Sequence, residues 1–464
     1  MELDCGFQTI GNATLIFHDG KPVLCTDPWF EGSAYFGSWG LSHRIPEEQR
    51  KAILDCEFVW LSHGHPDHLS GDSVALLRNK KILLPDHQGG RVRRDLEEQG
   101  FDVHVLPDKT WLQVSPRIRV FTIADYNQDG ILIADVNGRL VVNLNDASDH
   151  GWATYVRKVV KDYQLSYLLS LAGFGDADMA NMFDEAGQRL PEPERSPLGK
   201  TLSKRSEYWG TNRVIPFSAM HRYQRSDSAW ANSRSATLED YADGFDNKVA
   251  ALMPAFAKFN CLTDQVEEIC PPKNEEAPHD PKEFGDDWTE QMDPQDVARL
   301  RAYFQGVDHL RENLDFLRFT VGGKEEIVEL KSKEFKKGIT FEVPKNSLMT
   351  AVKFEVFDDL LIGNFMKATL HGEWGPRGLY PDFTPYVAKY ADNGRAKTAA
   401  ELRAYHGAYF RRDPTGYLRH RLDAAFLMPL QAHASNFLRS RLGAHSTVFN
   451  AAKKAFWAVK RKVA

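Results

Sequence analysis

The sequence predicts an α/β sandwich followed by a smaller α+β unit, and three observations support this fold class. First, 464 residues are more than a single hydrophobic core usually organises, so at least two units are expected. Second, short apolar runs alternate with helix-like segments and turns over roughly the first 150 residues. Third, strand-like segments with a turn at Gly322-Gly323 return after a polar, proline-bearing stretch.

The composition is that of a globular protein, with 42% hydrophobic and 26% charged residues. A net charge of −6 gives no overall basic field, so no nucleic-acid partner is expected. No window approaches the roughly twenty apolar residues of a transmembrane helix, and the N-terminus carries acids where a signal peptide needs basic residues. Five scattered cysteines without a CxxC pair indicate reduced thiols. A cytoplasmic location is therefore expected.

Two hairpins are expected in the first unit. One turns at Asp19-Gly20, with a second strand that ends at Asp27-Pro28, and the other turns at Asn137-Gly138. The run Phe58–His63 reads as a short buried strand. The polar, proline-bearing segment from Asp184 to Arg205 is predicted to be a mobile loop over the fold.

Changes in composition along the chain suggest three regions. Residues 1–265 are expected to form a metal-binding domain, 266–310 a linker or helical insertion, and 311–464 a C-terminal α+β domain with a basic helical tail. The sequence has no acid after Asp423, and the spacing of Phe449 and Phe456 is compatible with a basic amphipathic helix. The tail is expected to pack on its own domain, with peripheral contact to an anionic membrane or an acidic partner as the alternative.

The segment WLSHGHPDHLSG, Trp60 to Gly71, predicts a metal site. Three histidines and an aspartate, His63, His65, Asp67 and His68, lie within six residues directly after an apolar run. Histidines two apart at a strand end can bind one cation, and the aspartate and histidine after them can face a second. Imidazole and carboxylate suit zinc, iron and manganese.

The same segment matches the HxHxDH signature of the metallo-β-lactamase superfamily, and it is preceded by a strand that ends in TDP. This resemblance implies an αββα sandwich with the metals at the sheet edge. It also implies that His63 and His65 bind metal one, and that Asp67 and His68 bind metal two. The superfamily includes hydrolases as well as iron enzymes that reduce or activate oxygen, so the motif indicates the fold and not the reaction.

The resemblance also directs attention to two further carboxylates. Asp146 follows the strand-like RLVVNLN and would be the bridging ligand. The family usually has a histidine about twenty residues earlier, where this chain has Asp125, with Asp129 as the alternative. The other interpretation of Asp125 is a turn-forming aspartate. A carboxylate there favours iron or manganese over zinc. Carboxylate-rich sites of the superfamily resemble those of flavodiiron proteins and of the di-iron β-hydroxylase of chloramphenicol biosynthesis.

The last ligand is expected from a later strand. His221 in VIPFSAMH is the candidate, with a core or surface histidine as the alternative interpretation, and His150 lies only four residues after Asp146. Asp67 and Asp146 are the expected catalytic residues, because either would orient a metal-activated water in a hydrolase. Arg222 and Arg225 could contact an anionic group, although surface arginines are the commoner explanation.

A longer resemblance covers about residues 10–225. TDPWFEGSAYFGSWGLSHRIPEE, LAGFGDADMANMF and VIPF are similar to the metallo-β-lactamase-like region of CMP-N-acetylneuraminate hydroxylases. Those enzymes carry a Rieske segment, and this chain has no CxH…CxxH pair, so a separate electron-donor protein would be needed. The resemblance favours a non-haem di-iron oxygenase, a hydroxylase or N-oxygenase, with O2 as co-substrate and a small, anionic or sugar-derived substrate. The alternative is a zinc or manganese hydrolase of a phosphodiester, lactone or other ester.

Overall fold

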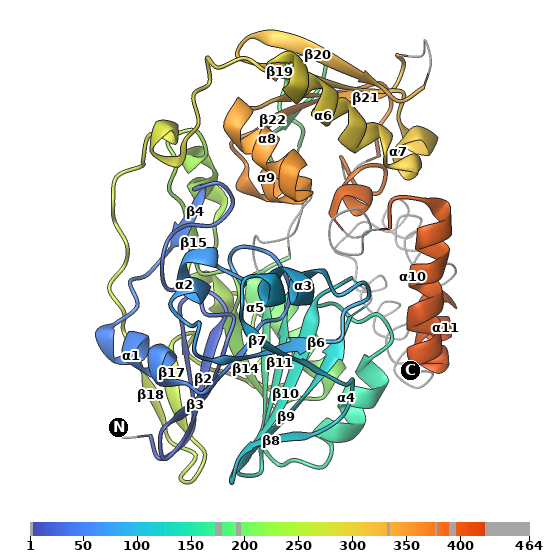
Figure 1. Ribbon diagram of the computed structural model, residues 1–464. Coiled ribbons are helices and arrows are strands. Elements are labelled where there is room, and N and C mark those ends of the chain that lie inside the picture. Colours follow the sequence, from blue (N-terminus) through green and yellow to red (C-terminus); the bar gives the residue numbers. More distant parts are fainter. Residues whose placement is uncertain are drawn as a thin grey trace, which may run out of the picture.

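Two β-sheets packed face to face form the larger part of the protein in the computed structural model (Figure 1). The structure describes residues 3–125, 127–171, 179–191, 196–331, 335–375, 378–388 and 396–422. We call the two sheets and the helices on their outer faces the sandwich. A five-stranded sheet with its own helices forms the smaller unit.

The first sheet of the sandwich is mixed. Its strands are β1 (Cys5–Ile10), β2 (Thr14–Asp19), β3 (Pro22–Thr26), β5 (Phe58–Trp60), β6 (Lys81–Pro85), β7 (Asp102–Leu106), β17 (Ala257–Asn260) and β18 (Val266–Glu268). Their order is β18-β17-β1-β2-β3-β5-β6-β7. Strands β3, β5, β6 and β7 run parallel, so their carboxyl ends meet at one edge. The segment that follows β5 therefore begins at that edge of the sheet.

The second sheet faces the first across a shared apolar core. Its strands are β8 (Leu112–Ser115), β9 (Ile118–Ala124), β10 (Gly130–Val136), β11 (Arg139–Asn145), β12 (Ser166–Leu171), β14 (Arg213–Phe217) and β16 (Ala251–Leu252). Their order is β16-β14-β12-β11-β10-β9-β8. The turn between β10 and β11 has Asn137 at φ 49° and Gly138 at φ 78°, the left-handed pair that a tight hairpin requires. Both predicted hairpins are confirmed, since β2 and β3 are also antiparallel neighbours.

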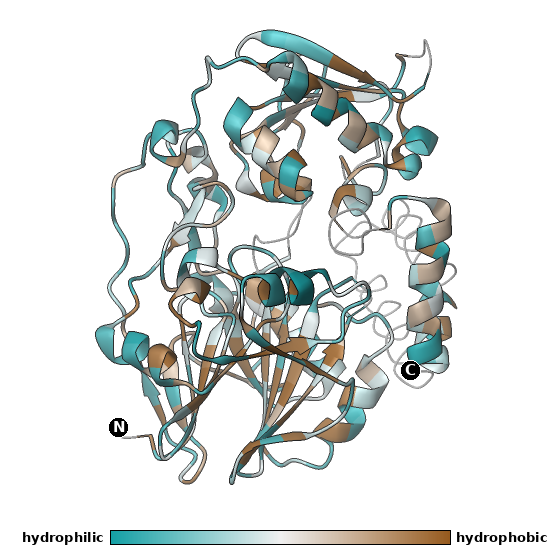
Figure 2. Cartoon of the chain, in the orientation of Figure 1, coloured by the Kyte–Doolittle hydropathy of each residue, from teal (hydrophilic) through white to brown (hydrophobic). Residues whose placement is uncertain are grey.

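Alternating side chains explain how the two sheets and their helices pack. Phe7, Phe17 and Phe259 of the first sheet meet Leu132 and Val141 of the second in one buried cluster. The opposite face of each sheet is apolar too. Much of the length of the strands is brown, that is hydrophobic, in Figure 2. These faces are covered by α1 (Glu47–Asp55), α2 (Gly71–Ala75), α3 (Arg91–Glu98), α4 (Ala153–Val160), α5 (Leu198–Trp209) and α10 (Ala399–Arg412). The sandwich is therefore an αββα fold, as the sequence predicted.

The smaller unit has a separate core. Its strands and helices are β13 (Met182–Phe183), β19 (Phe316–Val321), β20 (Lys324–Glu329), β21 (Gly338–Glu342), β22 (Lys367–His371), α6 (Pro294–Gln305), α7 (Asp308–Asn313), α8 (Lys345–Phe354) and α9 (Phe357–Gly363). Phe304, Phe319, Phe341 and Phe357 pack together inside it. The edge strand β13 comes from between β12 and α5 of the sandwich. The chain therefore enters the smaller unit before it completes the sandwich.

Short elements complete the chain. They are β4 (Trp39–Leu41), β15 (His221–Tyr223), η1 (Ala229–Arg234), η2 (Glu239–Ala242), η3 (Pro281–Phe284) and α11 (Pro414–Leu422). Between 266 and 310 the chain adds β18 to the first sheet and then runs through η3 to α6. In the part of the chain that the structure describes, no helix is long and apolar enough to cross a membrane. The predicted basic tail after 422 lies outside the described residues.

The predicted mobile loop from Asp184 to Arg205 is partly wrong. Its last residues are the first two turns of α5, which begins directly after Pro197 and ends before Gly210 at φ 80°. A proline before a helix start and a left-handed glycine after its end are ordinary helix boundaries. The proline read as a loop signal therefore marks where the helix begins.

Candidate metal centre

The HxHxDH segment is held in place at both of its ends. At its start, the backbone N–H of Ser62 donates to Oδ1 of Asp27 at 2.7 Å, which ties the segment to the end of β3. At its end, Ser70 caps α2 by accepting a hydrogen bond from the N–H of Ser73. The loop between β5 and α2 is therefore fixed over the carboxyl edge of the first sheet.

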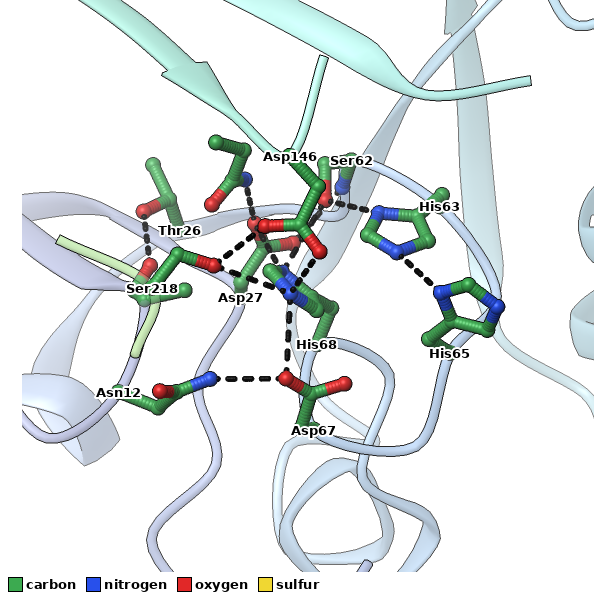
Figure 3. Close-up of polar contacts among 12 residues, drawn as sticks. Asn12, Thr26, Asp27, Ser62, His63, His65, Asp67, His68, Asp146 and Ser218 are labelled. Atoms are coloured by element: carbon green, nitrogen blue, oxygen red, sulfur yellow. Dashed lines mark hydrogen bonds and ion pairs between the residues drawn. The ribbon is translucent and has the colours of Figure 1, made fainter. Parts of the chain in front are cut away.

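The predicted ligands of this segment converge with Asp146 (Figure 3). Ligand atoms of His63, His68 and Asp146 all lie within 4.8 Å of one another. Nε2 of His68 is 3.5 Å from Oδ2 of Asp146 and 3.3 Å from Oδ2 of Asp67. Nε2 of His63 is 2.8 Å from Nδ1 of His65. The structure thus brings five of the sequence-predicted residues into one cluster.

Asp67 is oriented by two residues that the sequence did not indicate. Nδ2 of Asn12 donates to its Oδ2 at 2.9 Å, and the hydroxyl of Tyr35 donates to its Oδ1 at 2.5 Å. Burial acts to raise the pKa of Asp67, but the adjacent His68 and the hydrogen bond from Tyr35 outweigh it and lower the pKa. Asp67 is therefore an ionised, fixed carboxylate, as a metal ligand must be.

The ring of His68 is fixed by Asp27. Its Nδ1 lies 3.2 Å from Oδ2 of Asp27, and the same carboxylate accepts a hydrogen bond from Nδ2 of Asn145. A metal-binding histidine usually has such a carboxylate on its second ring nitrogen, because that contact sets the tautomer and the ring plane. Asp27, read from the sequence only as the end of a strand, directs Nε2 of His68 toward Asp67 and Asp146.

A serine, and not His221, lies beside the pair of His68 and Asp146. Strand β14 ends at Phe217, and Ser218 follows in the left-handed region with φ 61°. Its hydroxyl donates to Oδ1 of Asp146 at 2.6 Å and lies 3.4 Å from Nε2 of His68. Ser218 therefore occupies the position at the end of β14 from which a last ligand would reach the cluster.

His221 lies three residues further on, in β15, and does not join the group of His63, His68 and Asp146 within 4.8 Å among the described residues, so its role as the last ligand stays a prediction. Its ring stacks on Trp39 with centroids 3.3 Å apart, and burial lowers its pKa to about 3. Among the described residues, neither ring nitrogen has a hydrogen-bond partner. A buried neutral imidazole with two unsatisfied nitrogens is costly without a ligand. It borders a cavity of about 310 Å³ that is also lined by His43 and Lys273.

Asp125 and Asp129 lie at the end of β9 and the start of β10. Asp125 is fully buried: its Oδ1 is 2.5 Å from Nδ1 of His150, and its Oδ2 has no partner within the described part of the chain. Burial, Asp125 and Asp146 raise the pKa of Asp129 to about 7. Asp125 and Asp146 are thus each close enough to Asp129 to disfavour its charged form. Neither Asp125 nor Asp129 joins a group of ligand atoms within 4.8 Å among the described residues.

The structure adds an acidic pair from the smaller unit. Nε2 of His65 lies 3.0 Å from Oδ2 of Asp358 on α9, and a carboxylate oxygen of Asp359 lies within 4.8 Å of both. Burial acts to lower the pKa of His65, but Asp358 outweighs it and raises the pKa to about 9. In the sequence, the segment FDDLLIG indicates only the start of a helix, because acidic residues are common in a first helical turn.

The two arginines considered for an anionic substrate both donate hydrogen bonds to other residues of the protein. Arg225 is fully buried. Its guanidinium group donates two hydrogen bonds to the carboxylate of Asp227, at 3.0 and 2.8 Å, and one to the carboxylate of Asp286, at 2.7 Å. Arg222 donates to the backbone carbonyl of Asn274 at 3.3 Å. The surface interpretation of Arg225 is wrong, because its charge is balanced by two aspartates inside the fold.

The donor set fits a metal centre. Imidazole nitrogens and carboxylate oxygens converge from separate loops, and each is held by a further hydrogen bond. The buried Oδ2 of Asp125 has no partner among the described residues, which is costly unless a cation or other ligand satisfies it. Imidazole and carboxylate together are ligands of zinc, iron and manganese.

Comparisons with known proteins give partial matches. No family model matches the chain. Over 148 residues it is 27% identical to the cytidine monophosphate-N-acetylneuraminic acid hydroxylase of Danio rerio, a match that covers 30% of this chain and 25% of the hydroxylase. The chain thus matches about a quarter of the length of that relative.

Two solved structures are also similar. CmlA, a diiron β-hydroxylase from Streptomyces venezuelae, aligns with 56% of this chain and 55% of its own, at 14% identity and a TM-score of 0.37. Igni18, a metallo hydrolase from Ignicoccus hospitalis, aligns with 57% of this chain and 99% of its own, at 14% identity and a TM-score of 0.37. An αββα sandwich that gathers an HxHxDH segment and a strand-end aspartate at one edge has the architecture of the metallo-β-lactamase fold, with side chains at that edge that could hold metal ions.

Proposed function

We propose that this protein is a non-haem di-iron oxygenase, a hydroxylase or N-oxygenase of a small, sugar-type substrate. The observation that carries the proposal is the buried carboxylate of Asp125, with an oxygen that no described residue satisfies. It stands where the superfamily usually has a histidine. An anionic oxygen ligand in that place favours iron over zinc. The similarity to a hydroxylase over 148 residues supports the same class.

The proposed ligands divide between two ions. His63, His65 and Asp125 would hold the first, and Asp67 and His68 the second, with Asp146 shared between them. Three histidines and three aspartates make a set as rich in oxygen as in nitrogen. Bound iron would supply the activation of O2, and a separate electron-donor protein would supply the electrons.

The role of the protein is to hold these side chains and to limit access of water. Asp27 fixes the ring of His68, and Ser218 fixes the carboxylate of Asp146. His63, Asp67 and His68 are each at most 2% exposed, so bulk water does not reach them. A buried, preorganised site protects a reactive centre from side reactions.

The cavity beside His221 is the proposed substrate site. Its volume of about 310 Å³ suits a small molecule. Its lining includes charged side chains of both signs, among them Lys273, Arg222, Glu239 and Glu275, together with apolar groups. Such a lining suits a sugar-type molecule with hydroxyl or charged groups, and it includes Ala219, directly after Ser218.

The proposal is tested by loading metal-free protein with Fe(II) under anaerobic conditions and then admitting O2. Uptake of O2 with oxidation of both irons, followed by absorbance, is the expected result. The zinc-loaded protein is the control and should consume no O2. If the protein binds two irons but consumes no O2 in the presence of a chemical reductant, the proposal is wrong.

A two-metal hydrolase is the alternative. The compact group of His63, His68 and Asp146 favours it, because ligand atoms within 4.8 Å suit a metal-activated water. Asp67 or Asp146 would then orient that water toward a phosphodiester, lactone or other ester. Turnover of such esters by the zinc or manganese form, with an inert iron form, would support this alternative.

A further inference from the structure

We propose that Asp358, on α9 of the smaller unit, is a positioning residue for the metal ligand His65, so that the smaller unit forms part of the metal centre. The pair joins the HxHxDH loop of the sandwich to a helix 293 residues further along the chain. The inference rests on the metal centre of the proposed function, and it holds for either of the two reactions.

The two ring nitrogens of His65 have different partners. Nδ1 lies 2.8 Å from Nε2 of His63, and Nε2 lies 3.0 Å from Oδ2 of Asp358. The two nitrogens of an imidazole point in divergent directions, so the side that faces His63 is the side free to bind a cation with it. Asp358 therefore lies behind the ring, where it would accept a hydrogen bond from Nε2–H and would not share the ion.

That contact determines which nitrogen of His65 can bind metal. A carboxylate on Nε2 keeps the proton there and leaves the lone pair of Nδ1 toward His63. Asp358 is 2% exposed and the side chain of His65 is 15% exposed, so water competes little for this hydrogen bond.

The position of α9 is fixed from both units. Phe357, Leu360 and Leu361 on either side of the acidic pair are buried in the core of the smaller unit. At the other end of the helix, the hydroxyl of Ser38 in the sandwich donates to the carbonyl of Gly363 at 2.5 Å. Figure 1 shows α9 on the side of the smaller unit that faces the sandwich. The carboxylate of Asp358 is thus presented to His65 by a packed helix.

The test uses the full chain and cobalt as the probe. Metal-free wild type and Asp358→Asn are titrated with Co²⁺, and the visible absorption of the bound ion is recorded. Asp358→Asn keeps the size of the side chain and weakens the acceptor, so cobalt affinity should fall about 10- to 100-fold. The absorption bands at saturation should also shift, because the ligand field changes with the angle of the His65 ring.

Asp315→Asn is the matched control. Asp315 is a buried carboxylate of the smaller unit that accepts the backbone N–H groups of Lys336 and Lys337. This variant should lose stability but keep the wild-type cobalt spectrum. A folded Asp358→Asn protein with wild-type cobalt affinity and spectrum would overturn this inference but not the metal centre. Wild type that binds no cobalt would overturn the metal centre and the inference together.

A second variant covers the case in which Asp358→Asn does not fold. Asp358→Glu keeps the charge and moves the carboxylate by one methylene. It should restore folding and bind cobalt more tightly than Asp358→Ala, with a spectrum that differs from wild type. Equal spectra for Asp358→Glu, Asp358→Ala and wild type would contradict the inference.

Discussion

The carboxylate of Asp358 and the ring of His65 lie 3.0 Å apart, although 293 residues separate them in the chain. The first belongs to the smaller unit and the second to the motif of the sandwich. A second buried contact links the same parts, since Asp286 bonds Arg225 at 2.7 Å and the hydroxyl of Ser347 on α8 at 2.6 Å. The candidate metal centre therefore lies where the smaller unit contacts the HxHxDH loop.

Replacement of Asp146 by asparagine is expected to reduce the metal content from two ions to one or none. The carboxylate lies 3.5 Å from Nε2 of His68 and would be shared between the proposed ions, so removal of its charge would weaken both sites. Metal affinity should fall at least about 100-fold. Elemental analysis after dialysis measures the loss. Asp264→Asn, which removes only a surface pair with Arg139, is the control and should keep its metal.

Asp125→His is expected to change which metal the protein prefers. An imidazole at this position removes an anionic oxygen donor and favours zinc over iron. The ratio of iron to zinc bound from an equimolar mixture should fall about tenfold or more, because donor type governs this choice. His150→Gln is the control, since it removes the partner of Asp125 but leaves the carboxylate. An unchanged ratio in Asp125→His would contradict the role of Asp125 as a ligand.

Arg225→Met is expected to destabilise the fold. It leaves Asp227 and Asp286 inside the protein without their counter-charge. Loss of one partner of a buried ion pair costs about 3–5 kcal/mol in the free energy of unfolding. Urea denaturation of the metal-free protein measures this change. Arg222→Met, which removes hydrogen bonds to the loop at Asn274, should cost less than about 1.5 kcal/mol.

His18 is expected to make the fold sensitive to acid. Burial lowers its pKa to about 4, and Nε2 of Gln8 lies 2.8 Å from its Nε2, a contact that suits the neutral ring. The ordinary pKa is about 6.5, so between those pH values the unfolded chain binds a proton that the folded chain does not. Stability should therefore decrease as the pH falls from about 6.5 to about 4, by about 3 kcal/mol. The unfolding free energy of His18→Gln should fall less over that range. If the unfolding free energies of the two proteins fall equally with pH, His18 is not the cause of the acid sensitivity.

Local signals in the sequence were sufficient for much of the fold and for the core of the site. The Asn137-Gly138 hairpin follows from two residues that tolerate a positive φ. The HxHxDH loop could be read from residue type and spacing, and Asp146 was indicated by the resemblance to the metallo-β-lactamase superfamily. Each of these features depends on neighbours that are close in the chain.

The contacts that the sequence did not reveal depend on tertiary structure. Asp358 reads as an acid that favours a helix start, and only the packing of α9 shows that it faces His65. Ser218 is an unremarkable residue type, so His221 was the natural candidate for the last ligand. Ser218 follows β14 directly, and His221 lies three residues later in β15, where its role as a ligand stays a prediction. Arg225 could not be recognised as buried, because arginines are mostly exposed.

The metal content of protein purified without chelators tests the central claim most directly. The account predicts two irons for each chain and a ferric absorption band that disappears on reduction. Two zinc ions for each chain, together with ester or phosphodiester turnover and no uptake of O2 by the iron-loaded form, would contradict it.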